Sequence, residues 1–145
     1  HYNIREASKI EPSRYKRDQE KVLQLLSSTQ KKKAIVFMIS DFMADDYEHT
    51  LKIASKKHDI TGIRVYDIRE EKMPNIGMVS MLDAETGETH LINTGSKSVR
   101  INYEKYYQEK LKYFKETFSK SGAGVVNTRV DESYVTKLLG YFKSR

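Results

Sequence analysis

The sequence contains no cysteine, which excludes disulfide bonds, thiolate zinc sites and cysteine nucleophiles. This absence fits reducing and oxidising surroundings equally, so it leaves the compartment open. Long apolar runs are also absent. The longest covers residues 34–39, far fewer than the roughly 20 residues that a membrane-spanning helix needs. The first residues lack the charged and then apolar pattern of a secretory signal. We therefore expect a soluble chain.

Low-complexity segments, internal repeats and linkers are absent too, so the 145 residues are expected to form no more than one domain. Hydrophobic residues make up 38% of the chain and charged residues 32%, as in soluble globular proteins. The net charge of +6 is unevenly distributed. Residues 1–33 and 101–145 are basic, whereas residues 34–100 carry eight Lys/Arg against eleven Asp/Glu. A charge of this size is a modest bias and does not by itself identify a nucleic-acid-binding protein.

Hydrophobic patterns predict an alternation of helices and strands. The predicted elements are, in chain order, a short helix over 1–10, an amphipathic helix from Lys16 to about Gln30, a strand over 34–39 buried on both faces, a helix capped by Asp45 or Asp46, a strand over 60–66, a β-hairpin over 78–94, a helix over 103–118, a strand over 124–128 and a helix from Asp131. This order is typical of an open, mostly parallel α/β sheet with helices on both faces.

The carboxyl ends of the strands form the functional edge of such a sheet, because loops and helix N-termini converge there. Asp41 follows the first strand directly, and Asp45 and Asp46 stand just beyond it. A hard cation needs several oxygen ligands, so these acids suggest a cation site. In the alternative interpretation Asp41 closes a loop and the other two only begin a helix. A metal-dependent hydrolase would need these three carboxylates and Asp67 to converge on one point.

Other catalytic and nucleotide-binding motifs find no support. His49, His58 and His90 lack zinc-like spacing, and no phosphate loop or nucleophile elbow occurs. The glycines of residues 122–124 precede a strand, whereas a dinucleotide-binding loop follows one. We therefore find no positive indication of a nucleotide-binding enzyme or of a serine hydrolase.

Basic and aromatic residues are interleaved over residues 103–118, and residues 31–33 are three consecutive lysines. Lysines that neutralise phosphates and tyrosines that stack on bases could form a nucleic-acid surface. The alternative is that the aromatic residues form one buried stripe, and that the lysines between them form the solvated face of the same helix. Nucleic-acid binding is therefore kept as the second functional hypothesis.

A series of motifs runs through nearly the whole chain: AIVFMISDF at 34–42, HD at 58–59, RVYD at 64–67 followed by Pro74 and Gly77, DAETG at 83–87, Arg100 with Tyr103, and the closing stretch 134–145. Together these motifs resemble the uncharacterised bacterial proteins with a von Willebrand factor A-like domain that are encoded beside MoxR-type AAA ATPases. The resemblance implies a doubly wound α/β fold. It also implies that residues 1–145 form a single such domain, the carboxyl-terminal portion of a longer one.

The same resemblance implies a metal-ion-dependent adhesion site at the carboxyl edge of the sheet, which would bind Mg²⁺ or another divalent cation. Asp41 matches the aspartate that ends the fourth strand of that fold, and Ser40 stands beside it. The DxSxS loop of the family is absent from the chain, and the stretch where the family has a threonine offers Arg17 and Asp18. The metal site is therefore expected to be incomplete.

The function implied by the resemblance is that of a non-enzymatic protein-interaction module, which acts in protein assembly with a MoxR-type AAA ATPase. In the complete fold the strand over 34–39 would pair on both sides, but here one of its edges is expected to stay open. Exposed apolar edges recruit further strands, so we also expect a homo-oligomer, formed by antiparallel pairing of this strand.

Overall fold

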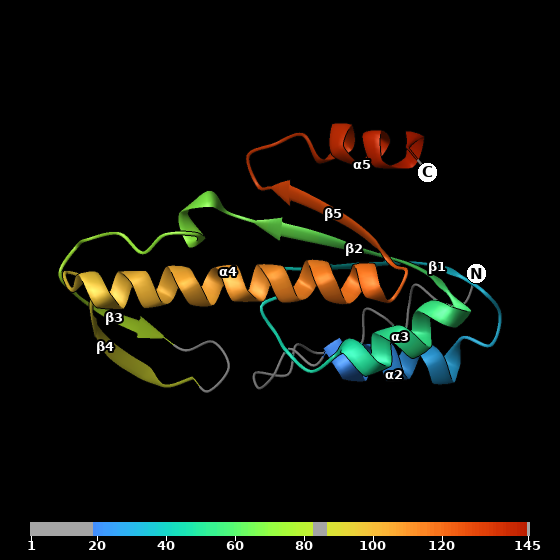
Figure 1. Ribbon diagram of the computed structural model, residues 1–145, viewed down its shortest axis with the longest axis horizontal. Coiled ribbons are helices and arrows are strands. Elements are labelled where there is room, and N and C mark those ends of the chain that lie inside the picture. Colours follow the sequence, from blue (N-terminus) through green and yellow to red (C-terminus); the bar gives the residue numbers. More distant parts are fainter. Residues whose placement is uncertain (1–18, 83–86, 145) are drawn as a thin grey trace.

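The computed structural model describes residues 19–82 and 87–144 (Figure 1). Its elements are, in chain order, α2 (Gln19–Thr29), β1 (Ile35–Ser40), α3 (Glu48–Lys57), β2 (Asp59–Tyr66), the 3₁₀ turn η1 (Ile68–Glu70), β3 (Met78–Leu82), β4 (Thr89–Asn93), α4 (Lys97–Lys120), β5 (Gly124–Arg129) and α5 (Tyr134–Lys143). The predicted alternation of helices and strands is confirmed. The predicted helix over 1–10, the segment 16–18 and part of the hairpin turn lie outside the described residues.

The main sheet has three parallel strands in the order β1-β2-β5. Ile63 in the central strand lies between Ile39 of β1 and Val126 of β5. β3 and β4 form a separate antiparallel hairpin, as predicted from the sequence. The α/β class and the parallel sheet are therefore confirmed.

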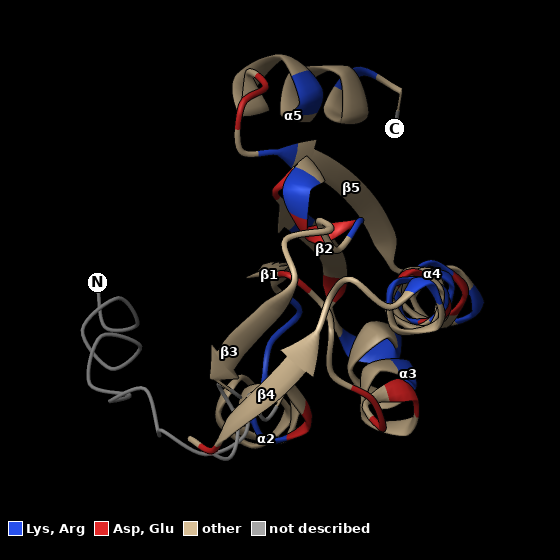
Figure 2. Ribbon diagram, turned by 90° about the vertical axis from the view of Figure 1, so that its left-hand side faces the viewer, with Lys and Arg blue, Asp and Glu red and all other residues tan. Residues whose placement is uncertain are grey.

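Helices cover the two faces of the sheet unequally. α3 and α4 pack on one face, with α2 against α3, and α5 is the helix of the described residues that lies on the other (Figures 1 and 2). Gly62 of β2 lets α4 approach closely, because a Cβ at this position would lie 2.5 Å from Phe118. The core lies on this side of the sheet and consists of Leu23, Phe42, Tyr47, Leu51, Ala54, Ile60, Phe114 and Phe118. Among the elements within 19–82 and 87–144, three helices thus lie on one side of the sheet and one helix lies on the other.

α4 is a 24-residue helix with one buried aromatic stripe, formed by Tyr107, Phe114 and Phe118. Lys105, Lys112 and Lys115 are exposed on its other faces. The interpretation of these aromatic residues as core is therefore confirmed. No helix in the described part of the chain combines the length and the apolar character that crossing a bilayer requires.

β1 departs from the prediction that it is buried on both faces. Val36 and Met38 pack against the core, but Ile35, Phe37 and Ile39 on the opposite face are 68%, 46% and 68% exposed. The reason is the position of the strand, since β1 forms one edge of the described sheet, and the part of the chain that the structure describes places only α5 over that face. An unbroken apolar run indicates a strand, but it does not show how many layers cover it.

Candidate functional site

A sharp turn at the end of β1 holds the two residues predicted as metal ligands. The Ser40 hydroxyl accepts a hydrogen bond from the Gln19 side chain at 3.1 Å and donates one to Asp41 Oδ1 at 3.2 Å. The same carboxylate oxygen accepts the backbone N–H of Met43 at 3.4 Å. Asp41 is therefore fixed at the carboxyl edge of the sheet, where the sequence places it.

Phe42 redirects the chain immediately after Asp41. Its backbone is left-handed, with a φ of 55°, a conformation that costs a non-glycine residue about 1 kcal/mol. The turn sends the ring back into the core, where it is 1% exposed and stacks on Phe114 with ring centroids 4.2 Å apart. Burying a phenylalanine side chain contributes about 2 kcal/mol, which offsets the strained backbone.

Asp45 and Asp46 do not cap α3 as the sequence predicts. The N-cap position belongs to Tyr47, which provides no side-chain hydrogen bond, and Asp46 has a left-handed backbone with a φ of 64°. Asp45 instead forms an ion pair with Lys110 of α4. Burial is the largest single influence on this lysine and opposes its charge, but the hydrogen bond and charge of Asp45 together with Tyr106 outweigh burial and raise the pKa of Lys110. Asp45 therefore fastens the loop to α4.

Asp67, the other strand-end acid, caps the short turn η1. Its carboxylate accepts the backbone N–H of Arg69 at 2.9 Å and pairs with the guanidinium of the same residue at 2.6 Å. These hydrogen bonds lower the pKa of Asp67. Over residues 19–82 and 87–144 no group of three or more His, Cys, Asp or Glu side chains could hold a metal ion. The predicted acids therefore do not form a common cation site in this part of the chain.

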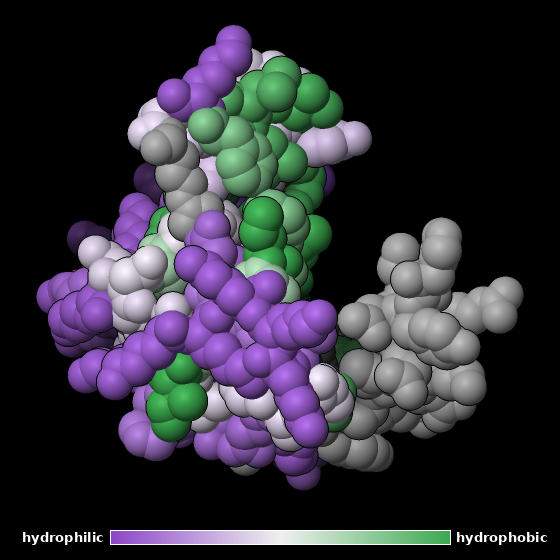
Figure 3. Space-filling model, turned by 90° about the vertical axis from the view of Figure 1, so that its right-hand side faces the viewer, coloured by the Kyte–Doolittle hydropathy of each residue, from purple (hydrophilic) through white to green (hydrophobic). Residues whose placement is uncertain are grey.

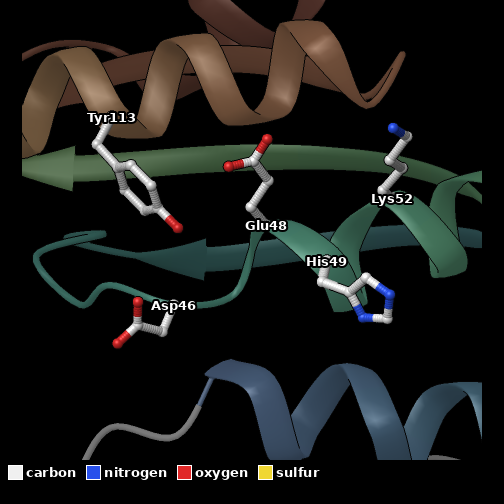
Figure 4. A pocket seen from close by; sticks show the side chains of 5 residues that line it. All are labelled: Asp46, Glu48, His49, Lys52 and Tyr113. Atoms are coloured by element: carbon white, nitrogen blue, oxygen red, sulfur yellow. The ribbon is translucent and has the colours of Figure 1, made fainter.

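An open pocket of about 460 Å³ lies beside the beginning of α3. Its lining residues are Asp46, Glu48, His49, Lys52 and Tyr113 (Figure 4). Glu48 and Lys52 point toward α4, whereas His49 points away from them. The side chains carry charges of both signs and do not converge on one point, so the pocket offers no arrangement for a defined reaction.

An apolar surface over β1 and α5 is a feature that the sequence pattern does not predict. We call it the open face and define it by Ile35, Phe37, Ile39, Val135, Leu139 and Phe142, whose exposures run from 45% to 68%. Phe37 and Phe142 join its two halves, with an edge-on ring contact at 5.8 Å. Figure 3 shows hydrophobic residues gathered over α5 and the adjoining part of the sheet. Contiguous apolar surfaces of this kind mark interaction sites.

The free edge of β1 borders the open face. Among the described residues, β1 pairs with β2 alone, along its full length from Ile35 to Ser40. The predicted open edge is therefore present in this part of the structure. Exposed lysines precede the strand at positions 31–33, and none of them forms an ion pair with a described residue. The edge thus has positive charge at its beginning and Asp41 at its end.

Comparison with known proteins identifies relatives of unknown function. The uncharacterized protein MAV169 of Mycobacterium avium is 26% identical over 121 residues, which are 83% of this chain and 71% of that protein. The uncharacterized protein Rv1480 of Mycobacterium tuberculosis is 21% identical over 135 residues. This match covers 92% of the chain, but the chain spans only 42% of the length of that relative. No solved structure matches the chain.

A family comparison agrees with these relatives. Residues 1–113 match the family described as "Protein of unknown function DUF58". This match includes α2, the whole main sheet except β5, the hairpin and most of α4. The resemblance to uncharacterised bacterial proteins is confirmed at this level, and the chain belongs to the DUF58 family.

Proposed function

We propose that this chain is a non-enzymatic protein-interaction module, and that the open face and the free edge of β1 are its binding surface. The observation that carries the proposal is the exposure of Ile35 and Ile39, each 68% accessible on a strand whose outer edge has no described neighbour. An exposed apolar strand edge is a template for pairing with another chain. A partner strand would gain main-chain hydrogen bonds from the edge and apolar contacts from the face beside it.

The residues at the carboxyl edge supply only part of a cation site. Ser40 and Asp41 supply adjacent oxygen atoms, but Mg²⁺ requires octahedral coordination and no third acidic or histidine side chain in the described residues joins them. These residues therefore do not fit a complete metal-ion-dependent adhesion site. The proposed module binds protein without depending on a cation.

The proposed partner is a MoxR-type AAA ATPase. The proposal follows from the sequence motifs that resemble von Willebrand A-like proteins encoded beside such ATPases, motifs that include the strand β1 itself. The chain spans only 42% of the length of Rv1480. A partner of a longer protein that contains this chain is therefore also part of the proposal. Association with further copies through the free edge is the other expected interaction.

A pair of matched variants tests this function. Ile39→Lys places a charge on the open face, whereas Leu91→Lys places the same charge on β4, where the side chain is similarly exposed at 71%. Binding of the purified chain to a purified MoxR-type ATPase is measured by calorimetry, and self-association is measured by sedimentation. We expect Ile39→Lys to weaken the observed association at least tenfold and Leu91→Lys to leave it unchanged.

Two results would reject this function. One is a wild-type chain that neither binds the ATPase nor self-associates at tens of micromolar concentration. The other is an equal effect of both lysine variants, which would place the binding surface elsewhere. Melting temperatures of the two variants show whether either substitution unfolds the chain.

Nucleic-acid binding remains the second candidate, because the lysines at 31–33 are exposed and unpaired with any described carboxylate. Base stacking by the aromatic stripe of α4 is excluded, since Tyr107, Phe114 and Phe118 are buried. Such binding would rest on phosphate contacts and would fall steeply with salt. A fluorescence titration with single-stranded and duplex DNA at low salt decides the question, and no binding there removes this candidate.

A further inference from the structure

Lysines gather at the edge of the main sheet where its strands begin. β1, β2 and β5 are parallel, so the segments that lead into them end at the same edge. α5 runs back to this edge, since the hydroxyl of Tyr141 near its end lies 3.1 Å from Oγ1 of Thr61 near the beginning of β2. We call this the lysine edge, formed by residues 30–34, 55–59, 119–123 and 141–144. These segments contain no arginine, a single acid, Asp59, and the lysines Lys31, Lys32, Lys33, Lys56, Lys57, Lys120 and Lys143.

Hydrogen bonds hold two of these segments together. The backbone N–H of Ala34 donates to Nδ1 of His58 at 3.3 Å, and the carbonyl of Ala34 accepts the N–H of Asp59 at 2.8 Å. The ammonium of Lys57 donates to the carbonyl of Ser27, in the last turn of α2, at 3.3 Å. The lysines before β1 and those before β2 therefore lie beside each other, although they are distant in the sequence.

The charges of the lysine edge face solvent. Its lysines are exposed apart from Lys57, which is partly buried. Lys120 pairs with Glu116 at 3.2 Å, and the other exposed lysines of this edge form no ion pair within residues 19–82 and 87–144. Figure 3 views the molecule from this end and shows hydrophilic side chains gathered below the apolar surface of α5. The edge is thus a positively charged surface that four separate segments form together.

The ends of helices explain only part of this pattern. A lysine in the last turn of a helix is stabilised by the helix dipole, and Lys56, Lys120 and Lys143 lie in the last turns of α3, α4 and α5. The lysines at 31–33 instead follow the end of α2 and lie outside any helix. Stabilisation of helix ends therefore does not account for the largest group.

From these relationships the geometry points to an anionic membrane surface as the partner of the lysine edge. Lysine carries a flexible, strongly hydrated point charge, whereas the planar fork of arginine matches the fixed geometry of a carboxylate or a nucleic-acid phosphate. An edge with seven lysines and no arginine attracts negative charge without imposing a geometry on it. Lipid headgroups meet this requirement, because they move in the plane of the bilayer and present many charges at once.

Two exposed apolar side chains beside the lysines favour lipid over nucleic acid. Ile35 follows the lysines at 31–33 and is 68% exposed, and Phe142 precedes Lys143 and is 45% exposed. At a bilayer such side chains enter the boundary between headgroups and acyl chains, whereas nucleic-acid phosphates would leave them in water. This inference goes beyond the proposed function, because it assigns a second surface and a different class of partner.

Vesicle binding tests the lysine edge in the full 145-residue chain. The probes are vesicles of phosphatidylglycerol and phosphatidylcholine in equal parts, with vesicles of phosphatidylcholine alone for comparison. Wild type should bind the anionic vesicles about tenfold more tightly than the neutral ones, or better, and this preference should fall as NaCl screens the charges. A surface lysine contributes about fivefold in affinity, so the triple variant should bind roughly a hundredfold more weakly. Its substitutions are Lys31→Gln, Lys32→Gln and Lys33→Gln.

Two further variants locate the binding surface. Lys56→Gln combined with Lys143→Gln removes charge from two other segments of the same edge and should weaken binding more than about tenfold. A control triple variant removes three exposed lysines at and near the beginning of α4, the end of the helix that lies away from the lysine edge, and should lose much less affinity. Its substitutions are Lys72→Gln, Lys97→Gln and Lys105→Gln. Melting temperatures show whether each variant remains folded.

Several results would overturn this inference. Wild type that does not bind anionic vesicles at low salt would reject it, and so would an equal loss of affinity in the control triple variant. An unchanged affinity of the variant at positions 56 and 143 would reduce the surface to one lysine segment and reject the edge. Tighter binding to duplex or single-stranded DNA than to anionic vesicles, at the same salt, would assign the lysines to nucleic acid instead.

The same proteins separate this inference from the proposed function. Binding to the ATPase, and its loss on Ile39→Lys, are measured without lipid. If vesicle binding fails while the chain still binds the ATPase, the interaction function stands without the lysine edge. If the chain binds vesicles through its lysines but binds no ATPase and does not self-associate, the lysine edge stands alone.

Discussion

The imidazole of His58 accepts a hydrogen bond at Nδ1 from the backbone N–H of Ala34, at 3.3 Å. The carbonyl of Ala34 accepts the N–H of Asp59 at 2.8 Å, so both polar groups of this residue are held at the beginning of β1. His58 ends α3 and is only 2% exposed. The histidine thus connects the helix preceding β2 to the strand that carries the free edge.

This contact predicts a loss of stability in mild acid. Burial, with a smaller effect of Lys57, lowers the pKa of His58 below the ordinary 6.5. Below pH 6.5 His58 becomes protonated in the unfolded chain while it stays neutral in the folded chain. The free energy of unfolding therefore falls as the pH decreases, and it levels off below the pKa of His58 in the folded chain. The slope cannot exceed about 1.4 kcal/mol per pH unit. Urea unfolding between pH 7.5 and 5 measures it.

His58→Gln should flatten this pH dependence, because glutamine can accept the Ala34 N–H without titrating. The exposed His49 provides the matched control, and His49→Gln should keep the wild-type slope. Equal slopes in wild type and in His58→Gln would show that other groups govern acid unfolding.

The close packing of α4 against Gly62 leads to a second prediction about stability. A methyl group at this position would lie 2.5 and 2.8 Å from two ring carbons of Phe118 and 2.9 Å from Phe114. Gly62→Ala should therefore force α4 away from β2 and cost about 1–3 kcal/mol, as overpacking does. Gly140 in α5 is the control, because a Cβ there meets nothing within 4 Å.

Gly140→Ala should stabilise the chain by about 0.5–1 kcal/mol, because alanine loses less conformational entropy in a helix. Both variants are compared with wild type by thermal and urea unfolding. The same change from glycine to alanine should therefore lower the free energy of unfolding at position 62 and raise it at position 140. If Gly62→Ala were as stable as wild type, the close approach of α4 to β2 would be wrong.

Much of the fold follows from the sequence because its elements carry strong local signals. The run at 34–39 and the apolar stretch at 60–66 are each found as strands, and the turn-rich segment between residues 78 and 94 is found as a hairpin. The stripe on α4 is equally plain, since aromatic residues recur at helical spacing and are buried where the pattern predicts. The spacing of the apolar residues and the length of each apolar segment are enough to predict these elements.

The burial of β1 and the roles of the acids could not be derived in the same way. The burial of a strand depends on how many helices pack on each face, and the sequence does not show that, among the described helices, α5 is the one on the face with Ile35 and Ile39. Asp45 reaches Lys110, 65 positions away, and thus serves a long-range contact where a local cap is predicted. Local patterns contain no information about such partners.

Arg64 illustrates the same limit and leads to a third prediction. This arginine is 3% exposed in the middle of the sheet, donates to the Tyr107 hydroxyl and lies over the Tyr66 ring at 4.2 Å. No carboxylate of a described residue pairs with it. Tyr107→Phe removes the acceptor and leaves a buried charged donor unsatisfied, which should cost about 2 kcal/mol.

The double-mutant cycle with Arg64→Met tests the coupling between the two side chains. Methionine fills the space without a charge, so removing the Tyr107 hydroxyl should cost much less in that background. Urea unfolding of all four proteins gives the coupling free energy. Additive effects would mean that Arg64 and Tyr107 do not depend on each other.

The final prediction concerns cations at the end of β1. Ser40 and Asp41 provide too few oxygen ligands for a firmly bound Mg²⁺ ion, so millimolar Mg²⁺ or Mn²⁺ should shift the melting temperature of wild type no more than that of Asp41→Ala. Asp41→Ala should still lose about 1 kcal/mol of stability, because the Met43 N–H loses its acceptor. Asp41→Asn keeps an acceptor and should recover part of this loss. A rise of several degrees with Mg²⁺ in wild type, absent from both variants, would instead establish a working cation site at this turn.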